Sequence, residues 1–378
     1  MVTGDSFSAE VESIASDGSG VARAGGMAVF LEMTAPGDIV SARITELHRS
    51  WARARVETLE SPSPLRAEPA CPAYGSCGGC SLQHLSYEAQ LAAKKAILRD
   101  AFTRIGGFRE PPEITALPSP AWGCRNRVRL HRGAGGLPGF KGRRSGEVWP
   151  LRDCPVADPG IRRLLAETGE ALPEDGVTLY SRGELLLAEG RWRELPPRGR
   201  LRLLDRDISL DAGLFFQSNA PMQEALIRGV LAAAEGAAPG GAADLYSGVG
   251  VFAAFLRDRF ERLFLAEQNP AALALARENA GEAEFFAGPS EKAAPAWLRR
   301  GGLSFIVADP PRGGLARSLA ESLAAAGPEV LAYVSCNAAS LARDARILCG
   351  GAYALKSLTL YDFYPQTAHI ESLAVFIR

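Results

Sequence analysis

The sequence predicts an α/β protein with three parts: a β-barrel over residues 1–60, a central α+β region over 65–212, and a doubly wound parallel sheet over 213–378. Two observations lead to this prediction. Short β-type runs separated by turn residues fill the first part, whereas strand-like and helix-like runs alternate after Ala242. The length of 378 residues is sufficient for two or three domains with cores of their own.

The composition indicates a globular protein, with 47% hydrophobic and 22% charged residues and a formal net charge of −1. No apolar run reaches the roughly 18 residues that a membrane span needs, and the first residues lack the basic start of a signal peptide. We therefore expect a cytoplasmic protein that does not enter a membrane. The seven cysteines, an odd number, favour a metal site and a reactive thiol over a disulfide framework.

Four β-type runs, over residues 7–11, 17–22, 27–31 and 37–44, begin the predicted barrel, which we expect to have five strands and an OB-like form. Such barrels often bind oligonucleotides through basic and aromatic side chains on one face. Nucleic-acid contact and a plain solvated strand edge are both compatible with the side chains near the last strand. They are His48, Arg49, Trp51, Arg53 and Arg55.

Three cysteines lie close together on a glycine-rich loop with the sequence C-P-A-Y-G-S-C-G-G-C. Cys71 and Cys77 are separated by five residues, and Cys77 and Cys80 by two. Glycine lets the backbone curl so that three sulfurs can face one soft metal centre. Zinc and iron–sulfur clusters both take a fourth ligand, for which Cys154 is the candidate. We favour an iron–sulfur cluster over zinc, and an accidental grouping of cysteines is the alternative.

A strong excess of positive charge follows in residues 122–152, which contain eight Lys and Arg residues against one Glu. In the run R-N-R-V-R-L the arginines alternate, so on a strand they share one face. A basic face beside a metal loop predicts contact with the phosphate backbone of a nucleic acid, and a solvated charged face is the alternative. The candidate RNA-binding residues are Arg125, Arg127, Arg129 and Arg132.

Polar residues end several strands of the predicted parallel sheet. The run D-L-Y-S-G-V-G indicates a strand, a glycine turn that a nucleoside-sized ligand can approach, and a helix. The next strand ends at Glu267, whose carboxylate can accept both hydroxyls of a ribose, and another ends at Asp309. The carboxyl ends of parallel strands face the ligand crevice. Together these features predict a ligand that contains adenosine.

Cys336 follows a predicted buried strand over residues 330–334 and precedes a predicted helix from Ala338. A thiol in this place meets the ligand crevice, and the helix N-terminus favours its thiolate. A buried core cysteine is the alternative. Ser335 and Asn337 are polar where a core strand would continue apolar, which favours the reactive thiol.

These motifs resemble those of the RNA 5-methyluridine methyltransferases, which transfer a methyl group from S-adenosylmethionine to C5 of uridine in ribosomal or transfer RNA. The resemblance covers nearly the whole chain. It comprises a TRAM-type barrel, the C-x5-C-x2-C loop, F-F-Q-S-N, D-L-Y-S-G-V-G, D-P-P-R, V-S-C-N and Q-T-x-H-I-E. It implies a Rossmann-like S-adenosylmethionine methyltransferase domain at the C-terminal end. We expect the protein to be a monomer.

The resemblance also implies roles for individual residues. Cys336 would be the nucleophile and Glu371 the base that abstracts a proton, with His369 as an orienting or purely structural neighbour. Cys71, Cys77, Cys80 and Cys154 would hold a 4Fe-4S cluster. The implied contacts to S-adenosylmethionine are Gln217, Tyr246, Gly248, Glu267 and Asp309.

The chain departs from the family pattern near the cofactor, at Val251 and at Gly288–Pro289, but not at Cys336 or Glu371. C5 of uracil is a poor nucleophile, so the reaction needs a thiolate that adds to C6 and a base that later removes the C5 proton. A stacked base must first leave its stack.

We expect 23S ribosomal RNA as the substrate because the barrel and the cysteine loop occur together. Transfer RNA is the alternative substrate, and a non-catalytic RNA-binding protein or a zinc-loaded binding module are the alternative functions. A DNA cytosine methyltransferase is disfavoured because its nucleophile characteristically follows proline, whereas Ser335 precedes Cys336.

Overall fold

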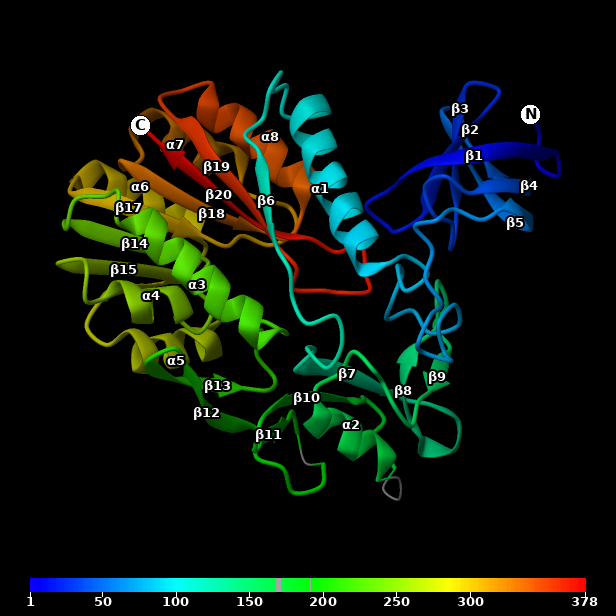
Figure 1. The fold of residues 1–378 in the computed structure, drawn as a ribbon. Coiled ribbons are helices and arrows are strands. Elements are labelled where there is room, and N and C mark those ends of the chain that lie inside the picture. Colours follow the sequence, from blue (N-terminus) through cyan, green and yellow to red (C-terminus); the bar gives the residue numbers. More distant parts are fainter. Residues whose placement is uncertain (168–170, 191) are drawn as a thin grey trace.

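The computed structural model describes residues 1–167, 171–190 and 192–378. Figure 1 shows the N-terminal barrel on one side, the large sheet on the other, and the central region below and between them. Strands β1 (Ser6–Ile14), β2 (Gly20–Ala24), β3 (Met27–Leu31), β4 (Ile39–Leu47) and β5 (Trp51–Ser61) close into a barrel in the order β1-β2-β3-β5-β4. Alternate side chains such as Val11, Val29 and Val40 fill its interior. The predicted five-stranded barrel is therefore confirmed.

The central region combines a five-stranded sheet with a separate hairpin. The sheet has the order β11-β10-β7-β8-β9 and carries helix α2 (Pro159–Ala166). The hairpin packs against helices of the large sheet domain. The strands of the sheet are β7 (Arg127–Arg132), β8 (Pro138–Lys141), β9 (Val148–Pro150), β10 (Val177–Arg182) and β11 (Leu185–Ala188), with a 3-10 turn over Ala134–Gly136; the hairpin is β12 (Arg198–Leu203) and β13 (Arg206–Asp211).

The large sheet has eight strands in the order β16-β15-β14-β17-β18-β20-β19-β6. Its first five strands are parallel, and β20 runs antiparallel between β18 and β19. The strands are β6 (Ile114–Leu117), β14 (Gly241–Leu245), β15 (Arg262–Glu267), β16 (Glu284–Ala287), β17 (Leu303–Ala308), β18 (Val330–Ser335), β19 (Ala354–Tyr361) and β20 (Glu371–Ile377). The predicted alternation of strands and helices is confirmed.

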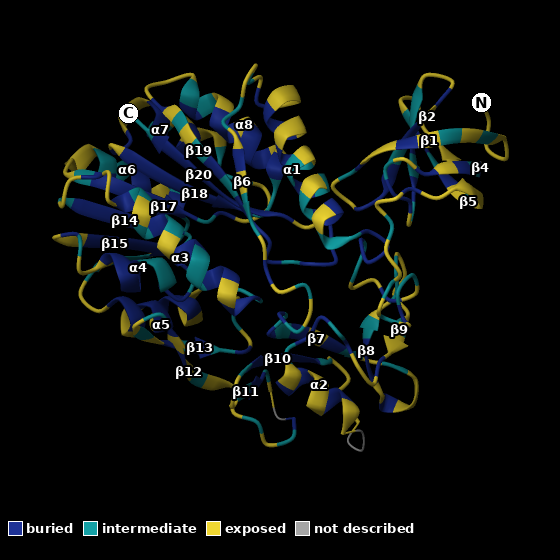
Figure 2. Ribbon diagram, viewed as in Figure 1, coloured by how far each residue is buried: buried dark blue, intermediate teal, exposed yellow. Residues whose placement is uncertain are grey.

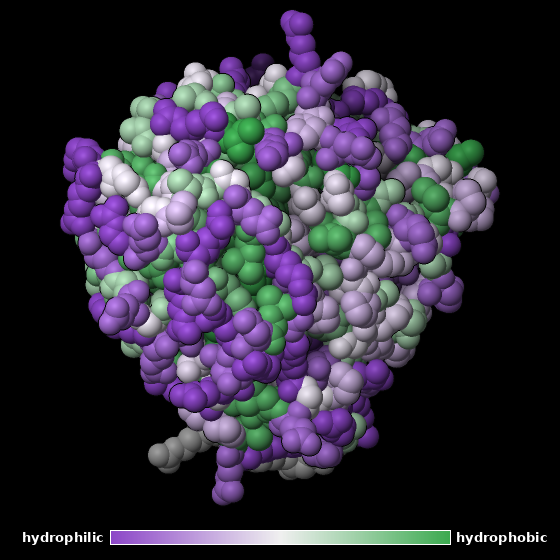
Figure 3. Space-filling model, turned by 60° about the vertical axis from the view of Figure 1, so that its left-hand side comes forward, coloured by the Kyte–Doolittle hydropathy of each residue, from purple (hydrophilic) through white to green (hydrophobic). Residues whose placement is uncertain are grey.

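Helices cover both faces of this sheet, and two apolar cores result. One face carries α3 (Ala220–Ala234), α4 (Val251–Leu256) and α5 (Pro270–Ala280), and the other carries α6 (Ser290–Arg300), α7 (Arg317–Ala326) and α8 (Ala338–Cys349). Figure 2 shows the strands almost wholly buried and the helices exposed only on their outer sides. In Figure 3, hydrophilic side chains cover most of the face that is shown, as expected for amphipathic helices packed on a sheet.

Two elements from the preceding chain complete the sheet domain. Strand β6 pairs in parallel with β19, so that Ile114 lies opposite Leu358. Helix α1 (Tyr87–Arg104) packs against α8 and buries Leu98 and Phe102 in the same core. The predicted domain boundary between residues 212 and 213 therefore does not separate the large sheet from the preceding chain, because α1 and β6 belong to the sheet domain. Within the described residues, no helix has both the length and the apolar character needed to cross a membrane.

Candidate active site

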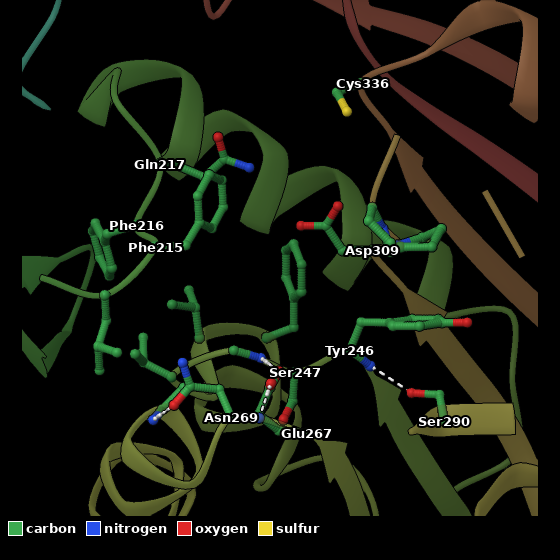
Figure 4. Close-up of a pocket in the computed structure, with 18 of the residues that line it drawn as sticks. Phe215, Phe216, Gln217, Tyr246, Ser247, Glu267, Asn269, Ser290, Asp309 and Cys336 are labelled. Carbon is green, nitrogen blue, oxygen red and sulfur yellow. Dashed lines mark hydrogen bonds between the residues drawn. The ribbon is translucent and has the colours of Figure 1, made fainter. Parts of the chain in front are cut away.

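One cavity of about 900 Å³ lies at the carboxyl ends of the parallel strands, where the sequence predicts the ligand crevice. Figure 4 shows Asp309 and Gln217 pointing into the space near Cys336, with Tyr246 and Glu267 deeper along the wall. Phe215 also lines the cavity and is 65% exposed, a feature that the sequence analysis did not single out. The structure thus brings together all the predicted catalytic and cofactor residues: Gln217, Tyr246, Gly248, Glu267, Asp309, Cys336 and Glu371.

The turn after β14 forms one wall of the cavity, and its backbone is unusual. Tyr246, Gly248 and Gly250 all have positive φ angles of 62°, 54° and 79°. A side chain at Gly250 would place its Cβ 3.0 Å from the Cα of Ala276, so only glycine fits without displacing α5. Tyr246 is held from two sides, because its N–H donates to Ser290 Oγ at 3.0 Å and its hydroxyl donates to Glu291 at 2.6 Å. The turn is therefore fixed before any ligand enters.

Two acidic residues anchor the same turn. Asp244 is fully buried and accepts a hydrogen bond from the N–H of Ala253 at 3.0 Å, and burial raises its pKa to about 8. Glu267 accepts from the N–H of Gly248 at 2.9 Å and from that of Asn269 at 2.7 Å, one bond on each carboxylate oxygen. Each oxygen can accept a second bond. Glu267 therefore keeps the capacity to bind two ribose hydroxyls.

Cys336 sits in a tight turn between β18 and α8. Asn337 caps the helix by accepting from the N–H groups of Ala339 at 2.9 Å and Ser340 at 3.2 Å, and its own N–H donates to Ser335 Oγ at 3.2 Å. These bonds fix the backbone on both sides of the thiol and orient it into the cavity.

The structure corrects the expectation that the helix N-terminus favours the thiolate of Cys336. Burial raises the pKa of this thiol to about 11, and the negative charges of Glu371 and Asp309 add to the increase. The guanidinium of Arg312 acts in the opposite direction but does not outweigh them. In the absence of ligands, burial and, to a smaller extent, the nearby carboxylates therefore keep the pKa of this thiol above its ordinary value, although it precedes a helix N-terminus.

Glu371 begins β20 and is 2% exposed. Its Oε1 atom is buried and has no hydrogen-bond partner among the described residues. Burial raises the pKa of this carboxyl well above its ordinary value, and the charge of Asp309 raises it further. Burial lowers the pKa of His369 to about 4, with further lowering by nearby positive charges, so this ring is neutral at pH 7. Of these two groups, Glu371 therefore has the higher affinity for a proton.

Helix α1 holds the loop that leads to Glu371. Lys94 is completely buried, and its ammonium donates to Asp362 at 2.5 Å and to the carbonyl of Tyr364 at 2.8 Å. Tyr87 donates to the other oxygen of Asp362 at 2.8 Å. Lys94 was not among the residues predicted for the site, although its position gave a signal: it lies three residues after Leu91 and four before Leu98, on the apolar face of the helix.

The four predicted cluster cysteines line a second cavity of about 290 Å³. All four are free thiols. Burial raises the pKa of Cys154 to about 12 and also raises those of Cys77 and Cys80, with the neighbouring cysteines adding to it. Four sulfurs around one space fit the donor set of a soft metal centre. As the side chains stand, no three His, Cys, Asp or Glu groups in the described ranges are close enough to hold a metal ion.

The candidate RNA-binding arginines differ in their surroundings. Arg127 and Arg129 line the cysteine cavity, and Arg129 is already bonded to Glu189 and Thr178. Arg125 lines both cavities, and its guanidinium lies 5.4 Å from the centre of the Tyr364 ring. On the barrel, Trp51 stacks on His48 with 3.8 Å between ring centres. Arg132 points to the other side of β7, where Glu174 is 4.0 Å away.

Two family descriptions match the chain: the TRAM domain at residues 3–56 and tRNA (Uracil-5-)-methyltransferase at residues 297–378. The first confirms the predicted TRAM-type barrel. The 23S rRNA (uracil(1939)-C(5))-methyltransferase RlmD of Azoarcus sp. is 33% identical, over 98% of this chain and 99% of its own. An uncharacterized RNA methyltransferase of Listeria monocytogenes is 29% identical, over 97% and 96% of the two chains.

Among solved structures, the Pyrococcus abyssi tRNA (uracil-54, C5)-methyltransferase in complex with S-adenosyl-L-homocysteine superimposes with a TM-score of 0.76. It is 25% identical in sequence, and the alignment covers 98% of this chain and 99% of that one. All three regions of the fold are therefore shared with that protein, including the barrel and the central region.

Proposed function

Because the chain belongs to the S-adenosylmethionine-dependent RNA (uracil-5-)-methyltransferases, we propose that it methylates C5 of a uridine in 23S ribosomal RNA through a covalent Cys336–C6 bond. The observation that carries this proposal is the meeting of Cys336 and Glu371 at one wall of the cavity. The identity of 33% with a 23S rRNA enzyme supports the ribosomal substrate. The likeness to a transfer RNA enzyme keeps transfer RNA as the second candidate.

We assign the cofactor to the part of the cavity between the glycine turn and Asp309. Glu267 would accept the ribose hydroxyls, and Tyr246 and Gly248 would line the wall beside them. Gln217 and Asp309 would lie nearer the reacting centre. S-adenosylmethionine supplies a methyl group on a positively charged sulfonium. The S-adenosyl-L-homocysteine bound by the Pyrococcus enzyme supports this assignment.

In the proposed reaction, Cys336 first loses its thiol proton to solvent, its thiolate forms a bond to C6 of uracil, and the electron pair of the C5–C6 bond becomes available at C5. C5 takes the methyl group as the methyl–sulfur bond of the cofactor breaks. Glu371 then removes the C5 proton, the C5–C6 double bond forms again, and the sulfur leaves C6. A positive charge near Asp309 lowers the pKa values of both Cys336 and Glu371. Cofactor binding would thus help to generate the reactive ionised forms.

We also propose that Cys71, Cys77, Cys80 and Cys154 hold a 4Fe-4S cluster with a structural role. The residue after Cys80 supports that role: the N–H of Ser81 donates to the carbonyl of Gln366 at 2.9 Å, and its hydroxyl accepts from Ala368 at 3.0 Å. The cysteine loop is thus tied to the loop before Glu371. Anaerobically purified protein should contain iron and sulfide and be brown, and Cys154→Ser should lose both; zinc without iron would overturn this assignment.

The reaction is tested by transfer of labelled methyl from S-adenosylmethionine to unmodified ribosomal and transfer RNA pools. We expect label as 5-methyluridine in ribosomal RNA, its loss in Cys336→Ala, and no change in Cys349→Ala, whose thiol lies at the far end of α8. Label in transfer RNA alone would move the proposal to that substrate. Absence of label in both pools would favour a non-catalytic RNA-binding protein.

A further inference from the structure

A third space, of about 410 Å³, lies where the barrel meets the cysteine loop, the central sheet and the loop before Glu371. We call it the junction groove. His369 lines both this groove and the active-site cavity, so the two spaces meet at that residue. Four segments of the chain line the groove. They are residues 16–17, 19 and 53 of the barrel, residues 78–81 of the cysteine loop, residues 141–144 of the central region and residues 367–369 of the loop before Glu371.

The charges in the junction groove are unbalanced. Arg53, Lys141, Arg143 and Arg144 line it, and Asp17 is the single carboxylate among its lining residues. Asp17 lies 3.4 Å from Arg53 and 3.6 Å from Arg144, which offset its charge. Arg143 and Lys141 form no ion pair within the described part of the chain, and Lys141 is exposed. The groove therefore has a net positive charge, and the Lys141 ammonium group, which forms no ion pair with the described residues, can bind an anion.

The floor of the groove is rigid. The N–H of Gly78 donates to the carbonyl of Lys141 at 3.0 Å, and a Cβ on Gly78 would lie 3.0 Å from that same oxygen. Arg143 donates to the carbonyl of Cys80 at 2.7 Å, while its Nε atom is buried without a partner in the described ranges. Close packing thus fixes the cysteine loop against the basic segment. A buried guanidinium N–H without a protein partner keeps an unused donor, which a bound water or a ligand oxygen can satisfy.

We propose that the junction groove binds the phosphodiester next to the target uridine, with Lys141 and Arg143 as its main contacts. This inference rests on the proposed function, since it takes a uridine of an RNA chain to occupy the active-site cavity. The backbone of that uridine must leave the cavity, and His369 marks the wall that the cavity and the groove share. A small anion joined covalently to the target nucleotide matches both the charge and the position of the groove.

The groove also differs from the strand of arginines predicted as the RNA contact. Arg129 on β7 is already bonded to Glu189, whereas the exposed Lys141 forms no ion pair with the residues that the structure describes. Phosphate contacts release counterions, so each contact steepens the dependence of RNA affinity on salt. A single phosphate contact therefore has a measurable signature that a structural side chain does not have.

The test compares Lys141→Ala with Lys356→Ala, which removes the same charge from an exposed position near the start of β19 that is not among the residues lining the groove. Binding of an unmodified 23S ribosomal RNA transcript is measured between about 50 and 200 mM salt. We expect Lys141→Ala to reduce the slope of log affinity against log salt by about one, with Lys141→Arg restoring it and Lys356→Ala leaving it unchanged. In methyl transfer, KM should rise while kcat changes less than about twofold. An unchanged slope and KM in Lys141→Ala would overturn the proposal.

A modified substrate tests the position of the phosphate. Once the methylated uridine is mapped, the phosphodiester beside it is replaced by an uncharged methylphosphonate. Wild-type protein should lose the same affinity that Lys141→Ala loses, and the variant should lose nothing further. If the two losses add, Lys141 contacts a different phosphate and the assignment is wrong. The wild-type methyl-transfer control separates this result from failure of the proposed function, because the salt slope is measured without turnover.

Discussion

Cys336 and Glu371 face each other across the ends of two neighbouring antiparallel strands. Ser335, the last residue of β18, pairs with Ser372 of β20, so the next position on each strand brings Cys336 opposite Glu371. The hydroxyl of Ser372 also donates to the carbonyl of Ser335 at 3.2 Å. A single β-ladder therefore sets the distance between the proposed nucleophile and the proposed base.

Glu371→Gln should trap the covalent intermediate. Without a base the C5 proton stays in place and the bond between sulfur and C6 cannot break, so we expect multiple turnover to fall by about 10²–10⁴-fold. Labelled methyl should appear in a protein–RNA adduct that survives denaturing electrophoresis. The double variant Cys336→Ala, Glu371→Gln serves as the control, and an adduct in that variant would show that another residue forms the bond.

The Cys336 thiol should react slowly with iodoacetamide in ligand-free protein. Its pKa of about 11 means that only a small fraction is thiolate at neutral pH, so the alkylation rate should rise about tenfold for each pH unit between pH 7 and 10. Glu371→Gln removes a nearby negative charge and should increase the rate at each pH at which Glu371 is ionised in the wild type. Mass spectrometry of the peptide that contains Cys336 measures both effects. A plateau below pH 9 would contradict the raised pKa.

Asp244→Asn should become more stable relative to the wild type as the pH rises. The pKa of Asp244 is about 8 in the folded protein and near 4 when unfolded, so between these values the folded state holds a proton that the unfolded state releases. The unfolding free energy of the wild type should therefore fall by about 1.4 kcal/mol per pH unit from this group. Urea midpoints of the two proteins at pH 5 and pH 7 test this, and a constant difference between them would refute it.

Alanine at Gly250 and at Gly248 should have different effects. Both residues have positive φ, which alanine tolerates poorly, by about 1 kcal/mol. At Gly250 the added Cβ also meets Ala276 at 3.0 Å, and we expect a further loss of about 1–3 kcal/mol in stability. At Gly248 no atom lies within 4 Å of the added Cβ, and the residue lines the cavity, so the main loss should be in affinity for S-adenosylhomocysteine. Denaturation and calorimetric titration separate the two losses, and equal stability of the two variants would contradict this account.

The strands and helices that depend on local sequence patterns were predicted from the sequence. The strands that end at Glu267 and Asp309 are apolar runs followed by polar residues, and both lie where the sequence places them. The antiparallel insertion of β20 between β18 and β19 was not predicted, because it depends on pairing between segments that are distant in the sequence.

Two features of the site depend on three-dimensional surroundings alone. The raised pKa of Cys336 arises from burial and from charges on other strands, which no reading of its neighbours in sequence supplies. The buried pair of Lys94 and Asp362 joins a helix to a loop more than half the chain away. The motif that contains Glu371 was recognisable, whereas the side chains that hold its loop were not.

Strand β6 has a consequence for biosynthesis. It leaves the ribosome long before β19, the strand beside which it must lie, so the sheet receives its outer strand only when nearly the whole protein has been made. Strands that are this far apart in the sequence pair slowly during folding. An unpaired strand edge is prone to association with other chains. A fragment that starts at residue 213 would retain β19 without its neighbour and expose the side of α8 that α1 covers. Such a fragment should aggregate on expression more than the full-length chain does.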